Sequence, residues 1–318
     1  MLDVQKGRRD IGFVALAIAF IFLLTIAIQI FIIIAVVQLL PWALEHPFWS
    51  WMISSGPMYA VAMPLSLLFF GRCRTLERPL RQRIGGLKYW GFLSICFVAI
   101  YVCNIAGTAA NEWFSNLLGR EAINEIEAVT MASPWWVNLI FTVLLAPVFE
   151  EIFFRKLVID RLLPYGELPA ILLSGIAFGL IHGNFNQFFY AAAIGMIFGL
   201  VYTRTGNIFY SISMHMILNL VGGVYAAEAQ KLLEGASWGG IFASIPAEVL
   251  GIVMMAVYVL LLVAALVGAV LAFLSYRDEF WPLQKGFFTP SPREWVQMLL
   301  LNPSVWVFLA VCGLMFVI

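Results

Sequence analysis

The sequence is poor in charged residues. Only 11% of its 318 residues are Asp, Glu, Lys or Arg, against roughly 25% in an ordinary soluble domain. The positive and negative charges cancel to a formal net charge of +0. Proteins that bind nucleic acid usually carry a basic surface patch, and the composition gives no sign of one. We therefore expect no nucleic-acid partner.

Cysteine is also scarce, and the four cysteines are widely spaced. Cys73, Cys96, Cys103 and Cys312 include no C-x-x-C pair. Structural zinc sites and small disulfide scaffolds rely on closely spaced or systematically paired cysteines. The cysteines are therefore expected to be small buried apolar residues, and the sequence predicts neither a disulfide framework nor a cysteine-based metal site.

Apolar residues dominate instead, and they occur in long blocks. They make up 63% of the chain, and several blocks exceed the roughly 20 residues that a membrane-spanning helix needs. Inside lipid every backbone polar group needs an internal partner, so helices are favoured. The sequence predicts an all-α, polytopic transmembrane bundle of about 8–9 helices with an intramembrane polar cavity. The expected spans are 11–40, 48–71, 90–110, 134–156, 168–183, 187–203, 207–226, 247–275 and 302–318.

The distribution of Lys and Arg predicts the orientation. The first apolar run is about twice as long as the core of a cleavable signal, so we expect it to be retained. With the N-terminus in the cytoplasm and alternating spans, every Lys and Arg except Arg120 and Lys231 falls on the cytoplasmic side. Such a bias is typical of integral membrane proteins. We expect the protein to lie in the plasma (cell) membrane, surrounded by the lipid bilayer.

A few polar residues interrupt these apolar runs. Glu150 and Glu151 end one run, His182 ends another, and His215 and Asn219 lie within a third. Ionisable groups inside a span cost a few kcal/mol or more each and are functional candidates by default. Taken singly, each has a structural explanation, such as an acidic rim or an interhelical hydrogen bond. Together they predict a functional site.

Helical spacing separates the roles of these residues. Residues four apart share a helix face, so Glu151 can pair with Arg155. Adjacent Glu150 then points elsewhere and lacks a local counter-charge, which suits a general base. His215 and Asn219 are also four apart and could offer two donors to an oxyanion. Chemistry alone leaves hydrolysis, metal binding and proton-coupled transport open.

Three ordered motifs resemble those of the CPBP family of intramembrane endopeptidases, also called the CAAX protease or Abi family. The E-E-x-x-x-R motif spans Glu150 to Arg155, the F-x-x-x-H motif spans Phe178 to His182, and the H-x-x-x-N motif begins at His215. Each motif alone is weak, but all three in order within apolar segments are specific. The resemblance covers roughly 134–225 and implies a catalytic core at 134–226, with other transmembrane helices at 1–133 and 227–318.

The resemblance implies an intramembrane endopeptidase that cleaves peptide or protein substrates at the membrane, of CAAX type or bacteriocin-processing type. Glu150 and His182 would activate a water, and His215 and Asn219 would stabilise the oxyanion. The supporting residues would be Glu151, Arg155 and Phe178.

The metal requirement is a separate expectation. Glu150, His182 and His215 could form a zinc site of the His₂Glu type, but the H-E-x-x-H spacing of common zinc peptidases is absent. We favour a glutamic protease without a cofactor, with zinc as the alternative. A non-enzymatic immunity or scaffold protein is a further alternative. A proton-coupled transporter is disfavoured because no repeated halves are evident.

One geometric difficulty concerns depth in the membrane. In straight spans Glu150 would lie near the inner face and His182 near the outer face. The segment from Pro169 to Gly183 is short for a span. We therefore expect the preceding helix to extend through Arg161, so that the next helix starts deep and brings His182 towards Glu150.

Overall fold

The computed structural model describes residues 3–73, 79–236, 245–279 and 283–317. Within these ranges the chain is helical and contains no strand. Among the described residues, seven helical stretches are long and apolar enough to cross a membrane, which confirms a polytopic helical bundle. They are Val4–Leu39 (α1), Pro47–Phe70 (α3, η1 and α4), Gly86–Leu118 (α5), Trp135–Tyr165 (α7 to η4), Phe185–Thr205 (α11), Ile208–Leu233 (α12, η5 and α13) and Ala247–Tyr276 (α14).

Shorter elements make up the composite stretches and connect the seven long ones. Within the composite stretches, the elements are α3 Pro47–Gly56, η1 Pro57–Ala62, α4 Met63–Phe70, α7 Trp135–Asn138, η2 Leu139–Leu145, α8 Ala146–Glu151, η3 Ile152–Ile159, α9 Asp160–Leu162, η4 Leu163–Tyr165, α12 Ile208–Leu218, η5 Asn219–Tyr225 and α13 Ala226–Leu233. Outside them lie α2 Trp42–Glu45, α6 Glu125–Ala132, α10 Glu167–Leu180, η7 Arg277–Glu279, α15 Pro292–Leu299 and α16 Pro303–Val317.

Two of the expected spans correspond to shorter helices. The expected span 168–183 is α10, which has only 14 residues. The expected span 302–318 is α16, which is bent by 63° relative to α15; counting this pair as one span gives up to eight. The stretch before α10, Trp135–Tyr165, continues past Arg161, and the chain reverses at Gly166, whose φ is +114°. The predicted extension of that helix is therefore confirmed.

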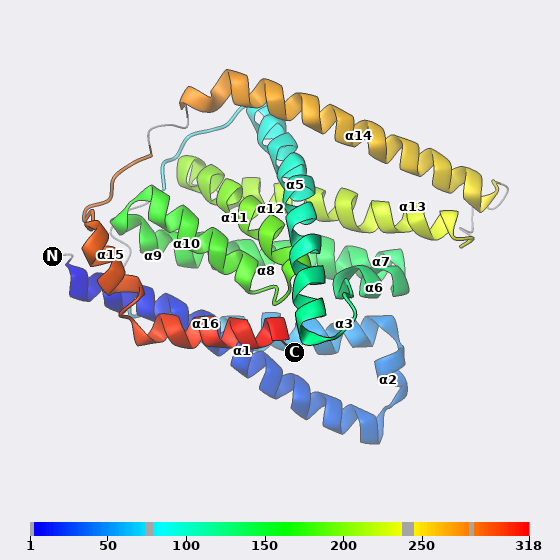
Figure 1. The fold of residues 1–318 in the computed structure, drawn as a ribbon, viewed down its shortest axis with the longest axis horizontal. Coiled ribbons are helices and arrows are strands. Elements are labelled where there is room, and N and C mark those ends of the chain that lie inside the picture. Colours follow the sequence, from blue (N-terminus) through cyan, green and yellow to red (C-terminus); the bar gives the residue numbers. More distant parts are fainter. Residues whose placement is uncertain (1–2, 74–78, 237–244, 280–282, 318) are drawn as a thin grey trace.

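The helices that carry the predicted site lie in the middle of the molecule. Figure 1 shows α8, α10, α11 and α12 between two outer groups of helices. On one side α14 packs against α5, which in turn packs against α11. On the opposite side α1 packs against α16, α15 and α4. The polar residues of the central helices are thereby shielded by apolar neighbours.

Glycine permits the close approach of α10 and α11. A Cβ added to Gly179 would lie 2.6 Å from the carbonyl oxygen of Phe188, and one added to Gly175 would lie 2.9 Å from the backbone nitrogen of Met196. Small residues of this kind let membrane helices pack backbone to backbone. The close crossing fixes the face of α10 that carries Phe178.

The central stretch Trp135–Tyr165 is not a uniform α-helix. Two π-helical segments, η2 and η3, flank the short α8, which ends at Glu151. A further π-helical segment, η5, begins at Asn219. π-Helical turns change the directions of neighbouring side chains and often occur at functional sites. Here they occur beside two of the three predicted motifs.

Candidate active site

The Glu151–Arg155 ion pair anchors the site. Arg155 Nε lies 2.8 Å from Glu151 Oε2, and both side chains are 0% exposed. A second bond joins Arg155 Nη2 to Glu151 Oε1 at 3.2 Å, and Nη1 donates to Ser174 Oγ on α10. The guanidinium also lies over the Phe178 ring. The predicted pair is thus confirmed, and it ties η3 to α10.

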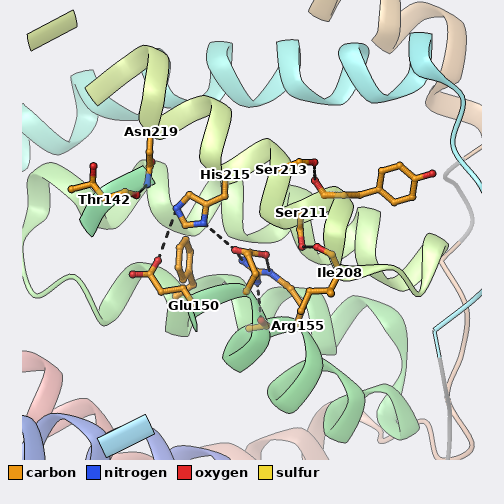
Figure 2. A network of polar contacts seen from close by, with 12 residues as sticks. Thr142, Glu150, Arg155, Ile208, Ser211, Ser213, His215 and Asn219 are labelled. Atoms are coloured by element: carbon orange, nitrogen blue, oxygen red, sulfur yellow. Dashed lines mark hydrogen bonds and ion pairs between the residues drawn. The ribbon is translucent and has the colours of Figure 1, made fainter. Parts of the chain in front are cut away.

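His215 lies between the two carboxylates, as Figure 2 shows for Glu150. Its Nδ1 is 3.3 Å from Glu151 Oε1, and its Nε2 is 3.9 Å from Glu150 Oε2. All three side chains are buried. Because a carboxylate accepts hydrogen bonds, the near contact places the Nδ1 proton towards Glu151. The Nε2 separation is too long for a direct hydrogen bond.

The ring of Phe178 joins the two histidines. Its centroid lies 5.1 Å from that of His182 and 5.8 Å from that of His215, with both pairs near perpendicular at 89°. Edge-to-face packing of this kind holds aromatic rings in a defined orientation. Phe178 therefore links His182 to His215, whose Nε2 lies 3.9 Å from Glu150 Oε2.

His182 is held by the turn between α10 and α11. Its Nδ1 lies 2.8 Å from the Phe178 carbonyl oxygen, so this nitrogen is the donor and Nε2 is left as the acceptor. Gly183 follows with a φ of +66°, which a glycine adopts without strain. Asn184 caps α11 by accepting from Gln187 N, and its amide donates to the His182 carbonyl oxygen. Local chemistry thus fixes the imidazole.

Tyr59 contacts Glu150 and was missed by reasoning from sequence. Its hydroxyl donates to Glu150 Oε1 at 2.9 Å, and its ring stacks on Phe149 at 5.0 Å. Tyr59 lies in η1, and it is 91 positions from Glu150 in the chain. The only signal in the sequence was a tyrosine inside an apolar run, whose hydroxyl needs a partner when buried.

Asn219 lies one helical turn from His215 but contacts another element. Its Nδ2 donates to the carbonyl oxygen of Thr142 in η2 at 2.8 Å, and Figure 2 shows these two residues side by side. An amide nitrogen carries two protons, so a second donor remains for a ligand. The convergence of His215 and Asn219 on one oxyanion stays a prediction, as does a water-lined hollow shared by the three catalytic candidates.

The residues that would hold zinc, if the protein binds it, are Glu150, His182 and His215. Over residues 3–73, 79–236, 245–279 and 283–317, no group of three or more His, Cys, Asp or Glu side chains is disposed to hold a metal ion. One nitrogen of each histidine is directed at a protein oxygen, which leaves the other nitrogen of each ring for a ligand. A site without a cofactor stays a prediction.

Comparison with known proteins assigns a family to this region. Residues 132–221 match the family model of the type II CAAX prenyl endopeptidase, Rce1-like. The chain contains an Rce1-like domain. This confirms the resemblance to the CPBP or CAAX protease family, and it indicates a protease, and so a hydrolase, in an integral membrane protein. Searches of curated proteins and of solved structures each found no match.

The Rce1-like segment contains every candidate residue taken from the sequence motifs. Tyr59, by contrast, lies outside the matched residues and reaches the site from η1. The helices before residue 132 therefore contribute directly to the surroundings of Glu150.

Proposed function

We propose that this protein is an intramembrane, glutamate-dependent endopeptidase. The observation that carries the proposal is the position of His215 between two buried carboxylates, with Phe178 linking it to His182. Burying such groups together in a membrane protein costs free energy, which makes them functional candidates by default. The Rce1-like family supplies the type of reaction, which is peptide hydrolysis at the membrane.

Glu150 and His182 would activate the attacking water. The carboxylate of Glu150 accepts a proton from the water, while His182 accepts a second hydrogen bond at Nε2. His182 has this acceptor available because its Nδ1 proton is directed at the Phe178 carbonyl. Tyr59 holds Glu150 by donating to Oε1, which leaves Oε2 to take the proton. The water oxygen then attacks the carbonyl carbon of the peptide bond.

His215 and Asn219 would stabilise the oxyanion that forms. A protonated His215 donates from Nδ1 to Glu151 and from Nε2 towards the reacting oxygen, and the second amide proton of Asn219 is the other donor. Glu150 next passes its proton to the amide nitrogen of the substrate, and the C–N bond breaks. Glu151 and Arg155 support the step by holding His215 in place.

The substrates would be peptides or protein tails at the membrane. CAAX-type substrates and bacteriocin-like peptides both fit an endopeptidase in this setting. We further propose a location in the plasma (cell) membrane with a cytoplasmic N-terminus. The distribution of Lys and Arg supports this orientation.

A peptide-library cleavage assay tests the proposal. The purified protein in proteoliposomes is incubated with prenylated and unprenylated peptides, and mass spectrometry identifies the products. We expect cleavage by the wild type and none by Glu150→Ala or His182→Ala, with both variants still inserted. Unchanged cleavage by either variant rejects the assignment of that residue.

The same preparation addresses the metal. Elemental analysis and treatment with a chelator are expected to show no stoichiometric zinc and no loss of cleavage. Bound zinc whose removal abolishes cleavage would favour the zinc-dependent alternative.

A further inference from the structure

The turn that carries His182 is held by parts of the chain outside the Rce1-like segment. This turn leads directly into α11, whose first residue is Phe185. Three elements outside residues 132–221 contact the turn or the first residues of α11. They are the end of α5, the loop 119–124 and the last turn of α16. All three therefore reach residues close to a candidate catalytic histidine.

The last turn of α16 packs directly on the His182 turn. A Cβ added to Gly183 would lie 2.9 Å from the Cβ of Met315. The Phe316 ring meets the Phe185 ring edge to face, with the two centroids 4.7 Å apart. Because packing this close transmits displacements, a shift of α16 would be passed to the backbone beside His182.

Arg120 fastens this end of α16 to the loop 119–124. Its Nη1 donates to the carbonyl oxygen of Val317 at 2.9 Å, and its Nη2 donates to that of Phe316 at 3.2 Å. A cation at the last turn of a helix also complements the helix dipole. Figure 1 shows the end of α16 beside the end of α5, which precedes this loop. The guanidinium thus fixes the position of the Phe316 backbone.

The loop and α5 also hold the start of α11. The buried Asn186 donates from Nδ2 to the carbonyl oxygen of Ile123 at 3.3 Å. The Phe114 ring meets the Phe185 ring edge to face at 5.2 Å, and a Cβ added to Gly107 would lie 2.6 Å from the Phe185 carbonyl oxygen. Phe185 therefore contacts aromatic rings from both α5 and α16.

The His182 imidazole depends on this turn for its position. Its Nδ1 lies 2.8 Å from the Phe178 carbonyl oxygen, and the His182 carbonyl oxygen accepts from Asn184 Nδ2 at 2.8 Å. Asn184 also caps α11, so a shift of α11 would pull on the backbone of His182. A displacement of about 1 Å at a catalytic group can cost on the order of 100-fold in rate, even when its cause is remote.

We propose that Arg120 and Phe316 are positioning residues that set the location of the His182 imidazole. Arg120 holds the last turn of α16, Phe316 carries that position to Phe185, and the turn passes it to His182. Both residues act through the turn and not by contact with the water or the peptide. Their effect on cleavage rests on the proposed function, whereas their effect on the imidazole does not.

Histidine-selective ¹⁵N labelling tests the position of the imidazole. The protein has three histidines, His46, His182 and His215, so His46→Gln and His182→Gln assign the spectrum of the full-length protein in micelles. We expect one set of His182 signals in the wild type, from the tautomer protonated at Nδ1. In Arg120→Met and in Phe316→Ala these signals should shift or split. Arg120→Lys, which keeps a donor, should lie between Arg120→Met and the wild type.

Two matched variants are the controls. Arg72 also donates to a carbonyl at a helix end, that of Leu68 in α4, and Phe31 is a 74% exposed ring on α1. Arg72→Met and Phe31→Ala should leave the His182 signals as they are in the wild type. Phe316→Leu replaces Phe316→Ala if the alanine variant does not fold.

The cleavage assay measures the consequence for the reaction. Arg120→Met should lower kcat on the order of tenfold with little change in KM, because the displaced imidazole impairs water activation and not substrate binding. Arg120→Lys should recover part of that loss. If the wild type cleaves no peptide, the proposed function fails and the histidine spectra alone decide on the positioning. Unshifted His182 signals in both Arg120→Met and Phe316→Ala, equal shifts in the control variants, or a change in KM alone would each overturn the proposal.

Discussion

Replacing Arg155 with methionine tests the buried ion pair most sharply. Arg155→Met keeps much of the apolar stem but removes both bonds to Glu151 and the bond to Ser174. The Glu151 carboxylate would then be 0% exposed and without its guanidinium partner. His215, whose Nδ1 is 3.3 Å away, would remain in contact with it.

The expected loss of stability is large. Removing one partner of a buried ion pair leaves an uncompensated charge and typically costs about 3–5 kcal/mol. Removing both charges, in Glu151→Leu/Arg155→Met, should recover about 2 kcal/mol of that loss, because no buried charge is left alone. Both variants should lose cleavage, because the single variant removes the guanidinium that holds Glu151 against His215 and the double variant removes the Glu151 carboxylate itself.

Reversible unfolding in mixed micelles, followed by tryptophan fluorescence, measures these free energies. Arg293→Met is the control, because Arg293 is exposed in the first turn of α15. The reasoning is refuted if Arg155→Met costs less than about 1 kcal/mol, or if the double variant is less stable than the single one.

Three other variants or probes follow from individual contacts. Tyr59→Phe should lower kcat about tenfold or more with little change in KM, since it removes a hydrogen bond to the charged Glu150; an unchanged kcat would contradict its positioning role. Gly179→Val should cost about 1–3 kcal/mol in unfolding free energy, whereas Gly313→Val, whose added Cβ meets nothing within 4 Å, should cost far less. Burial raises the pKa of the Cys73 thiol to about 12, so at pH 8 the folded protein should resist maleimide at this residue; rapid modification would show that the thiol is accessible.

Much of the architecture was predictable because the bilayer imposes it. Long apolar runs with few charges have to form helices, and seven such helices are present among the described residues. The Glu151–Arg155 pair was equally predictable, since residues four apart meet on any helix. Likewise, Phe178 and His182 are four residues apart and pack against each other.

Contacts between residues far apart in the chain could not be predicted from the sequence. The bond from Tyr59 to Glu150 joins residues 91 positions apart, and nothing in the local pattern links them. The bond from Asn219 to the Thr142 carbonyl depends on the π-helical segments η2 and η5, in which backbone pairing departs from the regular helix. The motifs therefore indicated which residues gather, and tertiary packing decides how they are oriented.

The cleavage rate of Glu150→Gln in proteoliposomes tests most directly whether this carboxylate activates the water. The substitution keeps the size of the side chain and its hydrogen bond with Tyr59 but cannot accept the proton. We expect the cleavage rate to fall about 100-fold or more. The control is Glu248→Gln, at the exposed start of α14, which should cleave at the wild-type rate. A Glu150→Gln protein that cleaves at the wild-type rate would contradict a glutamate-dependent mechanism.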